Sequence, residues 1–149
     1  MTLISAASHR GAQGEHLFEG HFLQSGIFIA APKHDLHRVD YVVEWNEQLV
    51  RVNVKTLYLC RKNGAEYYSA TLNTSCKGGA RPYTPDEIDY FGIVSLEYKH
   101  IWMIPLRDHK AQTIIWHPPQ KKHRKRIDSF NWDPYLINGV DITNSVKLS

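Results

Sequence analysis

Four residues among the first 55 have side chains that could together hydrolyse a phosphodiester bond. They are the carboxylates of Glu15 and Asp40, the amide of Asn53 and the amine of Lys55. Carboxylate and amide oxygens are the ligands that a hard cation such as Mg²⁺ prefers. A bound divalent cation neutralises phosphate charge and lowers the pKa of a water molecule, and a lysine beside it stabilises charge in the transition state. The question is which elements could bring these four side chains together.

Two strands joined by a tight turn are predicted between residues 39 and 60. Residues 39–45 (VDYVVEW) are rich in β-branched and aromatic side chains, which favour strands. Residues 48–60 (QLVRVNVKTLYLC) alternate between apolar and polar side chains over much of their length, as in a half-buried strand. The intervening residues 46–47 (NE) are predicted to form a two-residue hairpin turn.

This hairpin determines which polar side chains share a face. With a two-residue turn, Trp45 pairs with Gln48, and Asp40 lies opposite Asn53 with Cβ atoms about 5 Å apart. Lys55 then lies on the same face, diagonal to Asp40. A loop of odd length would shift the register and separate these groups.

The segment 11–25 predicts a helix with Glu15 at the edge of its apolar face. Phe18 and Phe22 are four residues apart, so both face the sheet. Two glycines on the same turn as the carboxylate would let the helix approach the sheet closely: Gly11 and Gly14. A carboxylate at such a packed edge is costly unless a cation compensates it.

The remaining pattern predicts an α/β fold with a mixed β-sheet flanked by helices. The further elements are a short buried strand at 27–31, a strand at 66–72, a loop at 73–83, a helix start at 84–87 and strands at 90–96 and 100–106. We expect residues 1–106 to form the core and residues 107–149 to form a basic, aromatic C-terminal extension that contacts DNA or mediates oligomerisation.

Positive charge is concentrated in that extension. The chain has a net charge of +3, and residues 107–126 alone hold seven basic side chains and one acidic side chain. This concentration indicates a polyanionic partner, although a solvated basic loop has the same pattern. The candidate DNA-contacting residues in this region and in the 73–83 loop are Lys77, Arg81, Arg107, Lys110, Lys121, Lys122, Arg124, Lys125 and Arg126.

Composition excludes several classes of protein. The 149 residues are 42% hydrophobic and 22% charged, as in an ordinary globular domain. No apolar run approaches the length of a membrane span, and the N-terminus lacks the apolar core of a secretion signal. The two cysteines, Cys60 and Cys76, form no CxxC pattern. We therefore predict a cytoplasmic protein with free thiols.

The polar residues also allow other interpretations. Residues 34–37 (HDLH) could belong to a zinc site, but further ligands at a familiar spacing are absent from the sequence. Considered singly, Lys55 could be a solvated lysine on an exposed strand. Glu15 could likewise be a surface carboxylate that favours the helix dipole. The four positions taken together favour the active-site interpretation.

The order of these residues resembles the PD-(D/E)XK nuclease superfamily. Glu15 on a helix, Asp40 on a strand and Asn53-Val54-Lys55 on the next strand match its element order, and the resemblance covers residues 11–106. Two branches are similar: the archaeal Holliday-junction resolvases and the small cyanobacterial intron homing endonucleases. The segments RVNVKT (51–56) and YTPDEIDYFGIVSLEYKHIWMIPL (83–106) look like the second branch.

The resemblance implies roles for individual residues. Glu15 and Asp40 would be ligands of Mg²⁺, for which Mn²⁺ would substitute, and the carbonyl of Val54 would be a further ligand. Lys55 would be the catalytic lysine. Asn53 stands where the family usually has an acid, so the metal would be held more weakly or the site would be inactive. Some members of the homing branch have an amide there.

These observations predict a metal-dependent endonuclease that acts on double-stranded DNA. Within that class we expect a site-specific intron homing endonuclease. The alternatives are a Holliday-junction resolvase with the same site and a DNA-binding module whose site is catalytically degenerate. A duplex has two strands to cut, so a homodimer or homotetramer is expected.

Overall fold

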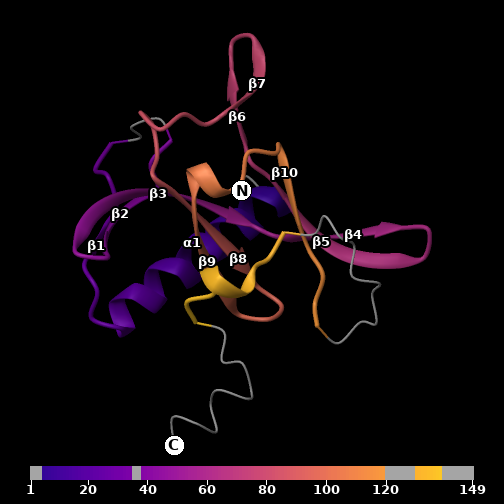
Figure 1. The fold of residues 1–149 in the computed structure, drawn as a ribbon, viewed down its shortest axis with the longest axis horizontal. Coiled ribbons are helices and arrows are strands. Elements are labelled where there is room, and N and C mark those ends of the chain that lie inside the picture. Colours follow the sequence, from indigo (N-terminus) through magenta and orange to yellow (C-terminus); the bar gives the residue numbers. More distant parts are fainter. Residues whose placement is uncertain (1–4, 35–37, 120–129, 139–149) are drawn as a thin grey trace, which may run out of the picture.

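A mixed five-stranded sheet is the centre of the computed structural model, which describes residues 5–34, 38–119 and 130–138 (Figure 1). The elements are α1 (Ala6–Gln24), β1 (Ile29–Ala30), β2 (Tyr41–Trp45), β3 (Gln48–Thr56), β4 (Tyr58–Lys62), β5 (Ala65–Thr71), β6 (Asn73–Cys76), β7 (Gly79–Pro82), β8 (Tyr90–Ser95), β9 (His100–Pro105), η1 (Leu106–Asp108), β10 (Thr113–Trp116) and η2 (Asp133–Tyr135). The central sheet has the order β1-β2-β3-β8-β9, in which only β3 and β8 are parallel neighbours. The predicted α/β class with a mixed sheet is confirmed.

Helix α1 begins five residues earlier than predicted. The Ser5 hydroxyl accepts a hydrogen bond from the Ser8 backbone N–H at 3.2 Å, which caps the first turn and allows the helix to start at Ala6. The helix ends as expected before Gly26, whose φ of 70° is a conformation that glycine adopts easily. The predicted residue Glu15 therefore lies near the middle of the helix.

The two faces of the sheet bury two different apolar clusters. Helix α1 covers one face with Phe18 and Phe22, which pack on alternate residues of β3, Val50, Val52 and Val54. The opposite face packs against a second cluster, which includes Leu57, Tyr83, Ile88, Phe91, Ile93, Trp102, Trp116 and Trp132. Because side chains alternate along a strand, the residues between the valines of β3 point toward this second cluster.

The predicted hairpin register is confirmed. Asn46 and Glu47 have φ angles of 51° and 66°, the conformation of a two-residue hairpin turn that matches the twist of its strands. Trp45 pairs with Gln48, and the ladder continues to Tyr41, which pairs with Val52. Strand β3 then continues for four more residues, which pair with β8 on the other side.

In two segments, the strands of the structure differ from the predicted strands. The single strand expected at 48–60 is divided at Leu57, whose carbonyl accepts two hydrogen bonds from the Arg10 side chain. The chain then leaves the central sheet, and β4 joins the separate sheet β10-β5-β4. The strand expected to be buried at 27–31 is a two-residue edge strand with an exposed Ala30.

The segment between residues 73 and 87 also differs from its prediction. The expected loop at 73–83 contains a hairpin of β6 and β7, which projects from the body of the molecule (Figure 1). The helix start expected at 84–87 forms a turn instead, although Glu87 does accept hydrogen bonds from the N–H and hydroxyl of Thr84. Strand β8 begins three residues after Glu87, which leaves no length for a helix.

Part of the chain beyond residue 106 packs on the second apolar cluster. Strand β10 pairs with β5, and the buried Trp116 and Trp132 lie against Trp102 of β9. The Trp132 indole N–H donates to the Ile115 carbonyl at 2.9 Å. The division into a core at 1–106 and an extension at 107–149 stays a prediction.

Substituting Gly14 tests how closely the helix must approach β3. A Cβ atom at Gly14 would lie 1.9 Å from Oγ1 of Thr56, whereas a Cβ at Gly11 would meet nothing within 4 Å. We expect Gly14→Ala to lower the free energy of unfolding by about 1–3 kcal/mol through overpacking. Gly11→Ala, the matched control, should raise it by up to about 1 kcal/mol because alanine favours helix. Equal urea unfolding midpoints for the two variants would contradict the close approach.

Candidate active site

The predicted catalytic residues line one open cavity beside the C-terminal half of β3. This cavity has a volume of about 640 Å³, and its walls come from the first half of α1, the end of β3 and the residue that precedes β2. The predicted site residues in its lining are Glu15, Asp40, Asn53, Val54 and Lys55. The structure thus brings together all the residues that the sequence pattern selected as catalytic or metal-binding.

Asp40 is held where β2 and β3 separate. Its backbone N–H donates to the Val52 carbonyl at 2.9 Å, and its Oδ2 accepts a hydrogen bond from the Val54 N–H at 2.7 Å. The regular ladder between the two strands ends one residue later in the chain, at Tyr41. The carboxylate therefore replaces a strand partner for β3, and its position is determined by the backbone rather than by a flexible surface contact.

Glu15 lies against Asp40 although it comes from the helix on the other side of the strand. Burial, the negative charge of Asp40 and a hydrogen bond between the two side chains raise the pKa of Glu15 to about 7. The Tyr41 hydroxyl donates to the Glu15 carbonyl at 3.3 Å and lies 3.3 Å from a carboxylate oxygen of Glu19. Two carboxylates so placed disfavour each other's ionised form.

Asn53 is buried, with 7% of its surface exposed. Its Nδ2 donates to the Arg38 carbonyl at 2.8 Å, which assigns the orientation of the amide. Its Oδ1 is buried and has no hydrogen-bond partner among the described residues. A buried amide oxygen without a partner is costly, and this one belongs to a residue that lines the same cavity as the carboxylate pair.

Lys55 is half-buried and lies over an aromatic ring. Its Nζ is 5.2 Å from the centre of the Tyr83 ring, within the range of a cation–π attraction. Tyr83 in turn packs edge-to-face against Phe91 of β8, with ring centres 5.3 Å apart. The ring therefore limits the directions that the lysine can take, and sequence analysis did not single out Tyr83.

The predicted DNA-contacting residues are divided between several surfaces. Lys77 is exposed in the turn between β6 and β7, and Arg107 and Lys110 line a second, larger groove of about 800 Å³ that contains none of the predicted catalytic residues. Arg81 instead makes a two-pronged ion pair with Glu87. The other five, Lys121, Lys122, Arg124, Lys125 and Arg126, lie outside the described residues.

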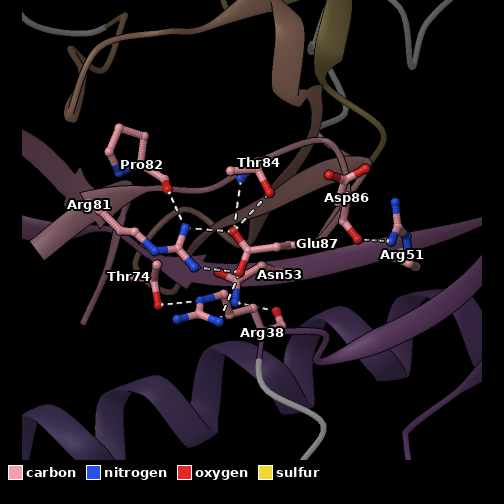
Figure 2. A network of polar contacts seen from close by, with 9 residues as sticks. All are labelled: Arg38, Arg51, Asn53, Thr74, Arg81, Pro82, Thr84, Asp86 and Glu87. Atoms are coloured by element: carbon pink, nitrogen blue, oxygen red, sulfur yellow. Dashed lines mark hydrogen bonds and ion pairs between the residues drawn. The ribbon is translucent and has the colours of Figure 1, made fainter. Parts of the chain in front are cut away.

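The structure also contains a charged network that sequence analysis missed. Glu87 lies between Arg81 and Arg38, and the Arg38 Nε donates to the Thr74 hydroxyl at 2.8 Å (Figure 2). Hydrogen bonding to Arg81 is the main cause that lowers the pKa of Glu87 to about 2, so this carboxylate is ionised under ordinary conditions. The only sequence signal was the spacing of Thr84 and Glu87, which indicated a helix start.

The zinc interpretation gains no support from the described residues. Three of the four residues in the 34–37 segment lie outside them, and within them no group of three or more His, Cys, Asp or Glu side chains could hold a metal ion. The candidate site has two carboxylates, those of Glu15 and Asp40. Its further oxygen donors would be the Asn53 amide and the Val54 carbonyl.

Comparisons with known proteins identify the family. The family model described as PD-(D/E)XK endonuclease matches residues 6–133, which is most of the chain. The chain belongs to the PD-(D/E)XK endonuclease family. The resemblance is therefore confirmed. The matched residues of this endonuclease include helix α1, Asp40 just before β2, strand β3 and the turn that contains Glu87.

A solved structure shares the fold. The bacterial homing endonuclease I-Ssp6803I matches with a TM-score of 0.71 and 17% sequence identity, covering 89% of each chain. No curated protein matches in sequence. The family and this shared fold support a nuclease. Among the described residues of this PD-(D/E)XK endonuclease, no helix is long and apolar enough to cross a membrane.

Proposed function

We propose that this chain is a Mg²⁺-dependent endonuclease that hydrolyses phosphodiester bonds in double-stranded DNA. The observation that carries the proposal is the carboxylate pair Glu15 and Asp40, which lies in one cavity with Asn53 and Lys55 at the open end of β3. This arrangement, in a chain of the PD-(D/E)XK endonuclease family, has the donors and the positive charge that phosphodiester hydrolysis requires.

The residues present fit a divalent cation. Burial and then the negative charge of Asp40 raise the pKa of Glu15, so a cation held by both carboxylates would relieve their repulsion. Asn53 has a buried Oδ1 without a partner in the described part of the chain. Glu15, Asp40 and the Val54 carbonyl would hold Mg²⁺, or Mn²⁺ in its place, with Asn53 in support. The chemistry that Mg²⁺ supplies when bound is neutralisation of phosphate charge and a lower pKa for water.

Lys55 acts on the phosphate that is attacked. Lys55 lines the same cavity as the carboxylates, and its ammonium group carries the only positive charge of the candidate catalytic set. A cation at this place stabilises the negative charge that develops on the phosphate oxygens and orients the attacking water. The Tyr83 ring limits the positions of the ammonium group, so part of the entropy of ordering it is lost before DNA binds.

A site-specific homing role is the preferred form of this activity. The chain shares its fold with a bacterial homing endonuclease over 89% of its length. The exposed Lys77, Arg107 and Lys110, with the basic residues at 121–126, would contact DNA phosphates. Cutting both strands of a duplex would need at least a homodimer, and a homotetramer is compatible with the same symmetry. The cytoplasm is the compartment we propose.

Cleavage of pooled substrates tests this role. The full chain is incubated with Mg²⁺ and a mixture of long linear duplexes and four-way junctions, and the product ends are sequenced. We expect double-strand cuts at one long, rare duplex sequence. Cuts confined to four-way junctions would instead show a junction resolvase.

Asn53 favours one alternative function, a DNA-binding module with a degenerate site. Its Nδ2 is already used to hold the Arg38 carbonyl, so an acid at this place would set a carboxylate against a carbonyl. We expect Asn53→Asp to lower the free energy of unfolding of the metal-free protein by about 1–3 kcal/mol.

The exposed turn residue Asn63 supplies the control, since Asn63→Asp should change stability by less than about 0.5 kcal/mol. Urea unfolding in a chelator compares the two variants, and equal losses of stability would contradict the proposed role of the amide. If the wild-type protein cleaves no DNA and Asn53→Asp does, the degenerate-site function is correct.

A further inference from the structure

Glu87 receives five hydrogen bonds or ion pairs from three residues although it lies in a turn outside the sheet. Both of its carboxylate oxygens bind the Arg81 guanidinium, at 2.7 and 2.9 Å, and its Oε2 lies 2.8 Å from Arg38 Nη1. The Thr84 N–H and hydroxyl also bind its Oε1 (Figure 2). Its side chain is 17% exposed, so these interactions are partly shielded from water. These donors together hold the Glu87 carboxylate in one conformation.

One side of this network leads to the carboxylates of the candidate site. The Arg38 side chain is held by Glu87, and the Arg38 carbonyl accepts the hydrogen bond from Asn53 Nδ2. Asp40 follows two residues later and binds the Val54 N–H. The regular β2–β3 ladder begins only at Tyr41, so the segment before it is held by the bond from the Asp40 N–H to the Val52 carbonyl and by these side-chain interactions.

The other side leads to the lysine. Glu87 binds Arg81 and Thr84, which lie on either side of Tyr83 in the chain. Tyr83 is 8% exposed, and the centre of its ring lies 5.2 Å from Lys55 Nζ. A shift of the segment from Arg81 to Thr84 would therefore move the surface against which Lys55 rests.

We propose that Glu87 is a positioning residue of the candidate active site. Through Arg38 it fixes the segment of Asp40, and through residues 81–84 it fixes the ring beneath Lys55. The carboxylate and the lysine come from different elements, and Glu87 joins the two segments that place them. The inference rests on the proposed nuclease function. Displacing a reacting group by about 1 Å can cost about 100-fold in rate, so a residue that never touches DNA can control cleavage.

The test removes the negative charge of Glu87 and keeps the shape of its side chain. Glu87→Gln should lower the single-turnover cleavage rate at saturating DNA and Mg²⁺ about 10- to 100-fold, while the DNA dissociation constant changes less than about twofold. Glu87→Asp, which restores the charge, should recover part of the rate. The matched control is Glu66→Gln, which breaks the Arg61–Glu66 ion pair of the β4–β5 hairpin and should leave the rate unchanged.

Two further comparisons separate positioning from loss of folding. Thermal unfolding gives the folded fraction of each variant at the assay temperature, to which the rates are normalised. Tyr83→Phe should keep the rate because the ring remains beneath Lys55, whereas Tyr83→Leu should lower it about 10-fold. If Glu87 acts through Arg38, the double variant Glu87→Gln/Arg38→Gln should lose no more rate than the more impaired of the two single variants.

The outcomes distinguish this inference from the function on which it rests. A normalised wild-type rate for Glu87→Gln, or an effect confined to DNA affinity, would overturn the positioning role while leaving the nuclease function in place. A wild-type protein that cleaves no DNA would overturn the proposed function and this inference with it. A normalised loss in Glu87→Gln with partial rescue by Glu87→Asp would support both.

Discussion

Lys55→Ala is expected to lower the rate of DNA cleavage about 1,000-fold, because it removes the positive charge that stabilises the transition state. The truncation should leave the fold intact. Lys55 is only half-buried, and the apolar core in this part of the chain is formed by Val54 and Leu57. DNA affinity should change only a few-fold, because one phosphate contact among many is lost. Single-turnover cleavage in Mg²⁺, measured with a binding titration in parallel, gives both quantities.

An exposed lysine of another strand is the control for this substitution. Lys62 at the end of β4 lies outside the candidate cavity, so Lys62→Ala should cleave at the wild-type rate. Full activity of Lys55→Ala would mean that the proposed site is wrong. A loss of cleavage that merely follows a loss of DNA affinity would make Lys55 a binding residue rather than a catalytic one.

Glu15→Gln is expected to abolish cleavage and yet stabilise the metal-free protein at neutral pH. Glutamine keeps the shape of the side chain but removes one of the two carboxylates that would hold Mg²⁺. It also removes the repulsion with Asp40 that contributes to the raised pKa of Glu15. A ligand residue of this kind lowers the stability of the free protein in exchange for affinity toward the cation.

The sign of the pH dependence follows from that pKa. The pKa of Glu15 is about 7 in the folded protein and 4.5 without burial, so the folded state binds the proton more tightly. The stability it contributes is present below about pH 4.5 and is lost as the pH rises through about 7. Because Glu15 is partly exposed, solvent screening limits this loss to roughly 1–2 kcal/mol.

Thermal unfolding in a chelator at about pH 5 and about pH 8 measures this difference. The wild-type protein should lose more stability between the two values than Glu15→Gln does. The exposed Glu44 of β2 gives a matched control, because Glu44→Gln should keep the wild-type pH dependence. Unchanged Mg²⁺-dependent cleavage by Glu15→Gln would contradict the role of the helix carboxylate.

Local pattern was sufficient to predict the hairpin that assembles the site. Asn46 and Glu47 both adopt positive φ, and the alternation of β3 leaves one register that buries Val50, Val52 and Val54. That register brings Asp40 to the end of β3 beside Asn53, as the spacing indicated. Turn geometry and side-chain alternation are properties of adjacent residues, so sequence alone carries them.

Interactions between distant residues were not predictable in the same way. Strand β3 ends where the Arg10 side chain binds the Leu57 carbonyl, 47 positions away, and no local feature at Leu57 marks that break. Glu87 and Thr84 match a helix-start pattern, and the N–H and hydroxyl of Thr84 do donate to Glu87, but Glu87 also binds arginines from two other segments. In both places, contacts with residues distant in the sequence determined the local structure and overrode the local propensity.

Cleavage of pooled duplex DNA by the wild-type protein is the direct test of the proposed nuclease function. The reaction is run with Mg²⁺, with Mn²⁺ and with a chelator, and DNA binding is measured over a range of salt concentrations. We expect double-strand cuts with either cation and none with the chelator. Salt-sensitive DNA binding with no cut in either cation would contradict the proposed function and would make Asn53, the amide in the place of the family's acid, the residue that accounts for the loss.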